Sequence, residues 1–329
     1  MLDKTYRNNI KNSMALKDDT KKIYLSKLNI IQNDIWKNCK TKRNIGKGKC
    51  LYYIIKHPEA FLDKLEDYVN NTGGRLENNK LSIHSKDAYV SAIGAIFRHT
   101  PGMMQNEYSL YQKWTDLHKI IREPINAKNQ TNRPDERQEK AYVPFEEVVK
   151  KRDGLKSGTN EKLLLAMYTM IPPVRSDYDK LAIYNNENLV NKDIDNYLIL
   201  NKKPYIVLNK YKTSKTYKTI KIVLPEDLVK EIKESLKNNK RDFLFVSSRN
   251  NKPYDKPNTF NRWANRVLKK IFNKNFSLKI LRNIFITRRD LKLEEKSGIE
   301  RNKIAKIMGH SLSTQQNYLW HTYEKEKRD

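Results

Sequence analysis

The sequence predicts a mainly α-helical fold with a small antiparallel β-sheet, arranged as a helical domain followed by a mixed one. Three observations predict it. Apolar residues recur at helical spacing through the first third of the chain, and a polar stretch without periodicity follows from Ala127 to about Tyr142. Three short β-rich runs then lie between two further helical regions. We therefore expect domains at 1–126 and 143–329, joined by a linker at 127–142.

Four helices are expected in the N-terminal domain. The segment LKDDTKKIYLSKLNIIQNDIWKN carries one apolar stripe, and HPEAFLDKLEDYV begins with Pro58 near a helical first turn. The segment SKDAYVSAIGAIFRH is a third helix, with Ser85 as its expected cap. The fourth, NEYSLYQKWTDLHKIIREPI, is expected to end at Pro124. Trp36 and Trp114 are expected to pack rather than to act chemically.

The C-terminal domain is expected to place a small sheet among helices. Helical segments VPFEEVVKK and EKLLLAMYTMI precede the stop PPVR. The β-rich runs are YLIL from 197, YIVLNKYKT from 205 and YKTIKIVLP from 217, and the last two form a hairpin whose turn holds Ser214 and Lys215. From Pro225 onward the pattern is mostly helical again, broken by FLFVSS at 243.

The charge balance points to a polyanionic partner. Lys and Arg total 66 against 38 Asp and Glu in 329 residues, so the formal net charge is +28. A surplus of this size repels itself unless a polyanion lies nearby, and nucleic acid is the usual one. A Lys- and Asn-rich composition inherited from an AT-rich genome is the simpler explanation, and it stays open.

The sequence gives no sign of a membrane, a metal or a secretory route. Cys39 and Cys50 have no metal-type spacing and are expected to form no disulfide framework. The start MLDKTYRNNIKNS has no apolar core of a signal peptide, and no apolar run approaches the roughly 20 residues of a membrane span. We expect a soluble intracellular protein without a metal or small-molecule cofactor.

Three basic sites stand out. Arg175 follows a double proline, which fixes the direction of the chain there; a surface ion pair with Asp177 or Asp179 is the simpler explanation. The hairpin carries seven lysines between 202 and 221, which equally suit a solvated edge. Lys279 and Arg282 lie three residues apart on one apolar-faced helix.

Together with His310 and Tyr318 these residues suit the displacement of a phosphodiester. Two arginines hold the extra negative charge on the non-bridging oxygens, and His310 adds a hydrogen bond to them. A hairpin lysine protonates the departing alkoxide, and Tyr318 is the nucleophile. The simpler reading of His310 and Tyr318 is a helix cap and a packed aromatic ring.

This ordered set resembles the catalytic domain of the tyrosine recombinases, or phage-type integrases. The tail IMGHSLSTQQNYL is similar to that family's closing motif, and LKILRNIFIT is similar to its H-x-L-R-H-T-F-A-T helix. The resemblance is strong over roughly 275–320, moderate around 165–225, and only architectural in the N-terminal domain, which would correspond to the family's core-binding domain.

The resemblance implies a site-specific recombinase or integrase that cleaves and rejoins double-stranded DNA through a 3′-phosphotyrosyl intermediate, as a homo-tetramer on DNA without cofactors or metal. It also implies roles for individual residues. The catalytic residues would be Arg175, Lys212, Lys279, Arg282, His310 and Tyr318. The DNA-binding residues would be Lys210, Lys215, Lys218, Arg288 and Arg289. Lys215 or Lys210 could replace Lys212 as the working lysine, and Tyr323 is a fallback nucleophile.

Departures from the family pattern leave other functions open. Lys279 stands where the family usually has histidine, as in the type IB topoisomerases, and Asn283 follows Arg282 where histidine is usual. The link from His310 to Tyr318 is one residue shorter than the commonest spacing. A type IB-like topoisomerase and a non-catalytic DNA-binding protein are the alternatives. An RNA-binding protein is a weaker one, because no aromatic RNP motif or GXXG loop is present.

Overall fold

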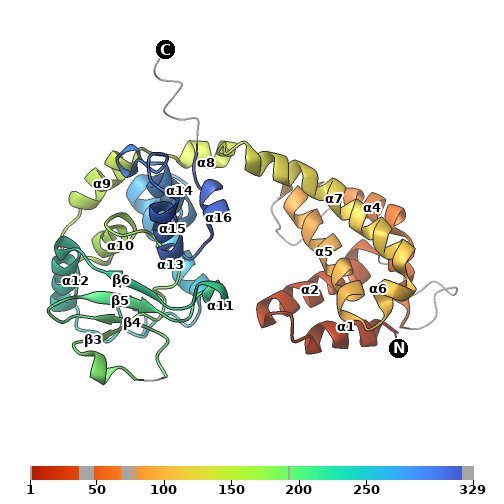
Figure 1. The fold of residues 1–329 in the computed structure, drawn as a ribbon, viewed down its shortest axis with the longest axis horizontal. Helices are drawn as coiled ribbons and strands as arrows, with labels where there is room; N and C mark the ends of the chain where they lie inside the picture. Colours follow the sequence, from red (N-terminus) through yellow and green to blue (C-terminus); the bar gives the residue numbers. More distant parts are fainter. Residues whose placement is uncertain (1, 37–47, 69–75, 78–79, 192, 321–329) are drawn as a thin grey trace, which may run out of the picture. The chain divides into compact units, whose positions relative to one another are not determined.

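The computed structural model describes residues 2–36, 48–68, 76–77, 80–191 and 193–320 (Figure 1). The chain divides into two compact units, residues 1–131 and 132–329. Each unit has its own apolar core. The division falls inside the stretch 127–142.

The first unit is almost entirely helical. Its elements are α1 (Leu2–Asn12), α2 (Asp18–Ile30), a π-helical turn (Ile31–Ile35), α3 (Cys50–Ile55), α4 (Pro58–Asp67), β1 (Leu76–Glu77), β2 (Lys80–Leu81), α5 (Ile83–His99), α6 (Met103–Asn106) and α7 (Tyr108–Gln130). Helix α5 packs against α1, α2 and α7. Its apolar residues are buried on several faces, which is typical of a central helix.

Two expectations about helix ends in this unit were wrong. Helix α5 begins earlier than expected: Ser82 is its cap, and the Ser82 side chain accepts from the Ser85 backbone N–H. Helix α7 runs through Pro124 to Gln130. Proline removes one backbone hydrogen bond, but Trp114 and Ile121 anchor the helix in the core before it.

The polar stretch 127–142 is largely helical rather than irregular. Helix α7 occupies its beginning, and α8 (Glu136–Ala141) follows with a capping box between Asp135 and Gln138. The polar composition hid α8 and the last turn of α7, because neither carries an apolar stripe. In the first unit, the buried Cys50 forms a disulfide, whereas the sequence spacing predicted no disulfide framework.

The second unit combines helices with a four-stranded sheet. Its remaining elements are α9 (Phe145–Asp153), α10 (Asn160–Thr169), β3 (Ala182–Tyr184), a 3₁₀ turn (Glu187–Leu189), β4 (Asn196–Ile199), β5 (Tyr205–Leu208), α11 (Ser214–Tyr217), β6 (Ile220–Val223), α12 (Glu226–Asn238), α13 (Pro257–Phe272), α14 (Leu278–Thr287), a second 3₁₀ turn (Arg289–Leu291), α15 (Gly298–Ile307) and α16 (Leu312–Gln316). Figure 1 shows α10, α13, α14 and α15 on one side of the sheet.

The predicted fold class is confirmed, with one difference in the sheet. The strand order is β3-β4-β5-β6, and the pairs β4–β5 and β5–β6 are antiparallel as expected. The sheet is mixed because β3 pairs in parallel with β4. Strand β3 is only three residues long, too short for its alternation to be visible in the sequence. The predicted run at 243 joins β3 through a single bridge between Ala182 and Phe243.

Two buried helices set the position of the site. Every residue from Leu163 to Thr169 of α10 is buried, and so is every residue from Ile280 to Ile286 of α14. Helices that are enclosed on all sides carry any polar side chain into the interior. Arg282 and Asn283 are therefore interior residues, 3% and 2% exposed.

No helix in the described part of the chain combines the length and the hydrophobicity that crossing a bilayer requires.

Candidate active site

The Gly-His pair forms the end of helix α15. The N–H of His310 donates to the carbonyl of Ala305 at 3.0 Å, and that of Gly309 donates to the carbonyl of Lys306 at 2.9 Å. Gly309 has φ +68°, so this is a Schellman motif with glycine in the left-handed position. The motif reverses the chain and leaves the Met308 and Gly309 carbonyls outside the helix.

Arg175 lies against this helix end. Its Nη1 donates to the Gly309 carbonyl at 3.0 Å, and its backbone N–H donates to Asp177 Oδ2 at 3.2 Å. The hydroxyl of the fully buried Tyr168, on α10, donates to the Arg175 carbonyl. The double proline and these bonds hold the Arg175 backbone between α10 and the sheet, as its place in the sequence predicted.

Arg282 reaches the same helix end from α14. Its Nη2 donates to the Met308 carbonyl and its Nη1 to the Tyr318 hydroxyl, both at 3.0 Å. The guanidinium carbon lies 4.6 Å from the centre of the Tyr318 ring. Burial lowers the pKa of Arg282, although an arginine in a protein keeps its charge. Its Nε is buried without a hydrogen-bond partner in the described residues.

Tyr318 follows α16 and is tied to α14 through its backbone. Asn283 Nδ2 donates to the Tyr318 carbonyl at 3.1 Å, and the Trp320 N–H donates to Thr287 Oγ1 at 3.1 Å. The Tyr318 ring stacks on His310, with ring centres 5.2 Å apart and planes at 22°. The residue is half-buried, and its hydroxyl lies against the buried Arg282.

His310 is buried and neutral at physiological pH. Burial, together with the positive charges of Arg282 and Arg175, lowers its pKa to about 4. Its Nδ1 lies 3.1 Å from the Ser311 carbonyl, which can only accept, so the ring proton is on Nδ1. Nε2 then carries a lone pair, and it has no partner in the described residues.

Two carboxylates lie close to Arg175. Burial raises the pKa of Asp177, although Arg175 opposes the shift. Burial and the neighbouring Asp177 raise the pKa of Asp179 to about 6. Asp177 bonds to the Arg175 backbone, so it helps to fix the loop that presents the guanidinium.

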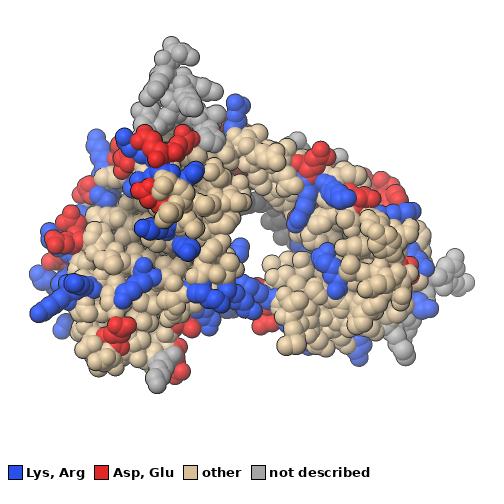
Figure 2. Space-filling model, viewed as in Figure 1, with Lys and Arg blue, Asp and Glu red and all other residues tan. Residues whose placement is uncertain are grey.

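The hairpin lysines lie on the connection between β5 and β6. This connection contains the short helix α11 in place of the simple turn expected. Lys212, Lys215 and Lys218 are exposed, while Lys210 pairs with Asp195 at 3.1 Å. Figure 2 shows Lys and Arg side chains gathered where Figure 1 places α11.

The other predicted basic residues differ in their placement. Lys279 is exposed on α14 and makes no ion pair or hydrogen bond with a described residue. Arg288 packs its guanidinium 4.6 Å from the centre of the Phe145 ring and 4.2 Å from that of Phe285, and it pairs with Asp290 at 3.4 Å; its DNA contact stays a prediction. The side chain of Arg289 lies outside the described ones.

The structure gives roles to three polar residues to which the sequence assigned none. Asn196 Nδ2 donates to the carbonyls of Asp177 and Lys210, at 3.3 and 2.9 Å, joining the Arg175 loop to the hairpin. Asn283 positions the Tyr318 backbone, and Thr213 binds the Gly309 carbonyl at 2.6 Å. Single asparagines and threonines carry no local signal, because these contacts link residues far apart in the chain.

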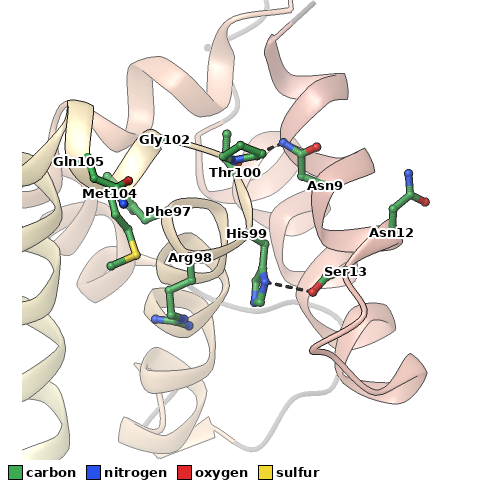
Figure 3. Close-up of a pocket in the computed structure, with 11 residues that line it drawn as sticks. Asn9, Asn12, Ser13, Phe97, Arg98, His99, Thr100, Gly102, Met104 and Gln105 are labelled. Atoms are coloured by element: carbon green, nitrogen blue, oxygen red, sulfur yellow. Dashed lines mark hydrogen bonds between the residues drawn. The ribbon is translucent and has the colours of Figure 1, made fainter.

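The first unit has a hollow between the end of α1 and the α5–α6 turn (Figure 3). Ser13 Oγ lies 3.1 Å from His99 Nδ1, and Asn9 Nδ2 donates to Thr100 Oγ1 at 3.4 Å. These four polar groups pair with one another, and Arg98 is the one arginine or lysine among the residues that line the hollow. In the described residues, no group of three or more His, Cys, Asp or Glu side chains is arranged to hold a metal ion.

Comparisons with known proteins give a structural likeness and no match in sequence. No family model and no curated protein matches the chain. Among solved structures it is similar to the crystal structure of XerA recombinase, with a TM-score of 0.41 and 16% identity, over 99% of this chain and 96% of that chain. A likeness of this degree carries no conclusion about the chemistry of this chain.

Gly309→Ala should lower the free energy of unfolding by about 1–2 kcal/mol, because an L-residue in the left-handed region costs that much. The new Cβ would also lie 3.4 Å from Thr213 Oγ1 and from the Tyr211 ring. Urea denaturation measures the change. Gly298→Ala is the matched control, since its Cβ meets nothing within 4 Å. Equal losses for the two variants would contradict the strain argument.

The stability that His310 contributes should depend on pH. Between pH 6.5 and about 4 the unfolded chain binds a proton that the folded chain does not, so the free energy of unfolding falls as the pH drops through this window. The difference between wild type and His310→Gln should therefore shrink from pH 7 to pH 4, by at most about 1.4 kcal/mol per pH unit. Urea denaturation at each pH measures it.

Asp179 changes the free energy of unfolding in the opposite direction. Because its carboxyl pKa is raised to about 6 in the folded protein, the folded state gains stability as the pH falls through that value. Asp179 is present in wild type and in His310→Gln, so its contribution cancels in the difference between their free energies of unfolding. A difference that does not change with pH would show that His310 is not held neutral by the fold.

Proposed function

We propose that this protein cleaves and rejoins DNA strands through a covalent 3′-phosphotyrosyl intermediate, as a site-specific recombinase or integrase does. One observation carries the proposal. Arg175 and Arg282, far apart in the sequence, donate to the consecutive carbonyls of Gly309 and Met308, beside His310 and Tyr318. The predicted nucleophile itself bonds to Arg282.

The charge of this cluster supports a phosphate ligand. Arg282 is buried, and no described carboxylate forms an ion pair with it. Burying an unpaired cation is costly, and a bound anion removes that cost. A phosphodiester offers two non-bridging oxygens to two guanidinium groups, which hold them with directed hydrogen bonds. These groups become most effective when negative charge grows in the transition state.

The reaction needs a nucleophile, a base and an acid. The Tyr318 oxygen attacks the phosphorus, the bond to the 5′ oxygen breaks, and a 3′-phosphotyrosyl ester and a free 5′-hydroxyl result. We propose His310 Nε2, which carries the lone pair of the neutral ring and has no partner in the described residues, as the acceptor of the phenol proton once the Tyr318 hydroxyl turns from Arg282 toward the phosphate. The sequence suggested a different role for His310, a hydrogen bond to the phosphate oxygens, and that role stays a prediction. Attack by the 5′-hydroxyl of the same or another strand reverses the step.

Lys212 is proposed as the acid that protonates the leaving 5′ oxygen. The exposed Lys215 and Lys218, with Lys210, are proposed to contact the phosphates of double-stranded DNA, and such contacts position the duplex without reading its sequence. Lys279 stays a predicted catalytic residue, exposed three residues before Arg282. A tetramer on DNA is a further prediction, and it comes from the sequence resemblance alone.

Tyr318→Phe should abolish the covalent adduct with DNA. The probe is a pool of nicked duplexes with randomised sequence around the nick. After cleavage, the short fragment that bears the free 5′-hydroxyl diffuses away, so the strand cannot be rejoined and the adduct accumulates. Wild type should give adducts that survive SDS, and sequencing them should reveal the preferred site. Tyr318→Phe should give none while it keeps DNA binding, because only the hydroxyl is lost. Tyr184→Phe, on strand β3, is the matched control.

The same pool separates the alternatives. Binding without an adduct by wild type would favour a non-catalytic DNA-binding protein. Adducts with no sequence preference, together with relaxation of supercoiled plasmid, would favour a type IB-like topoisomerase. An undiminished adduct in Tyr318→Phe would contradict the assignment of the nucleophile.

Tyr318 should act on the phosphate that its own chain binds. Its hydroxyl, its carbonyl and Trp320 are all bonded to α14 of the same chain. A mixture of Arg175→Ala and Tyr318→Phe proteins should therefore form no more adduct than either alone. Recovery of the adduct in the mixture would show that one chain supplies the tyrosine and another the arginines.

A further inference from the structure

The Gly309 carbonyl joins the hairpin to the phosphate site. It accepts from Thr213 Oγ1 at 2.6 Å and from Arg175 Nη1 at 3.0 Å. A carbonyl oxygen has two lone pairs, so both bonds can form together. The residue after Gly309 is His310. The Thr213 hydroxyl thus bonds the lysine-bearing hairpin directly to the Gly309–His310 segment, and the same Gly309 carbonyl binds Arg175.

A second contact holds the other side of Lys212. The Tyr211 hydroxyl donates to the Lys218 carbonyl at 2.6 Å, which closes the loop around α11. The Tyr211 ring lies against Gly309, since a Cβ built there would be 3.4 Å from two ring atoms. Lys218 has φ +57°, so the closed loop carries backbone strain that these contacts offset.

Lys212 is the hairpin lysine whose two chain neighbours both meet Gly309. Lys210 lies before this point and pairs with Asp195. Lys215 lies within α11, and Lys218 follows it. A flexible lysine loses less rotational freedom on reaching a target when its backbone is already fixed nearby.

We infer that Thr213 is a positioning residue, whose hydroxyl bond to Gly309 holds Lys212 in place to protonate the leaving oxygen. The inference rests on the proposed function and narrows it to one lysine. Thr213 itself touches no reacting atom. Its loss should therefore affect proton delivery and spare the phosphate clamp of Arg175 and Arg282.

Leaving-group chemistry distinguishes these two effects. The 5′ oxygen leaves as a poor alkoxide unless it receives a proton, whereas a thiol has a pKa of about 8.5 and leaves as the thiolate. A duplex with sulfur in place of the bridging 5′ oxygen therefore needs no acid. Defects in an acid disappear on this substrate, and defects in phosphate binding remain.

The experiment compares adduct formation on oxygen and sulfur duplexes of the selected sequence. Thr213→Val should slow the oxygen duplex by roughly 10- to 100-fold, as expected for a displaced acid, and slow the sulfur duplex by less than about threefold. Lys212→Ala should show the same pattern more strongly, and adding Thr213→Val to it should cause no further loss. Thr213→Ser, which keeps the hydroxyl, should stay close to wild type.

Thr216→Val is the matched control, because Thr216 is an exposed residue of the same helix α11. Thr213→Ala is measured in parallel, with circular dichroism and DNA affinity for every variant, so that misfolding is recognised. Equal slowing on both duplexes, no slowing by Thr213→Val, or a serine variant as slow as valine would each overturn the inference. An absence of adduct with wild type would instead overturn the proposed function.

Discussion

The candidate site depends on how helix α15 ends. A left-handed glycine reverses the chain there and turns two consecutive carbonyls away from the helix ladder. Met308 offers its oxygen to Arg282 and Gly309 offers its own to Arg175. The helix C-terminus also carries a partial negative charge that favours cations. One backbone turn therefore gathers two arginines and sets the histidine beside them.

Several buried polar atoms of this arrangement have no hydrogen-bond partner in the described residues. The same burial that lowers the pKa of His310 also leaves donors and acceptors of Arg282, Asn283 and His310 unpaired in the described residues. Unpaired buried polar atoms are rare in stable cores and each needs an explanation. A phosphate between the arginines would satisfy the cationic donors. The unpaired atoms thus lower the free energy of unfolding of the protein alone, and binding of a phosphate would raise it again.

Local patterns in the sequence predicted most of the helices, the hairpin and the Arg, Gly-His and Tyr segments. They did not predict that α7 passes Pro124, because burial of Trp114 outweighs the loss of one backbone bond. They did not predict that Arg288 lies against the rings of Phe145 and Phe285. The connections made by Asn196 and Thr213 were invisible, since each joins segments that only the folded chain brings together.

The departures from the recombinase pattern fit the same geometry. Where that pattern has histidine after the second arginine, this chain has Asn283, and its amide holds the Tyr318 backbone at 3.1 Å. The link from Gly-His to tyrosine is one residue shorter, yet the phenol still reaches Arg282 and stacks on His310. The Asn283 amide and the Trp320 N–H both tie this segment to α14. The Asn283 amide and the stacked ring of Tyr318 therefore act together to hold the end of the described chain against α14.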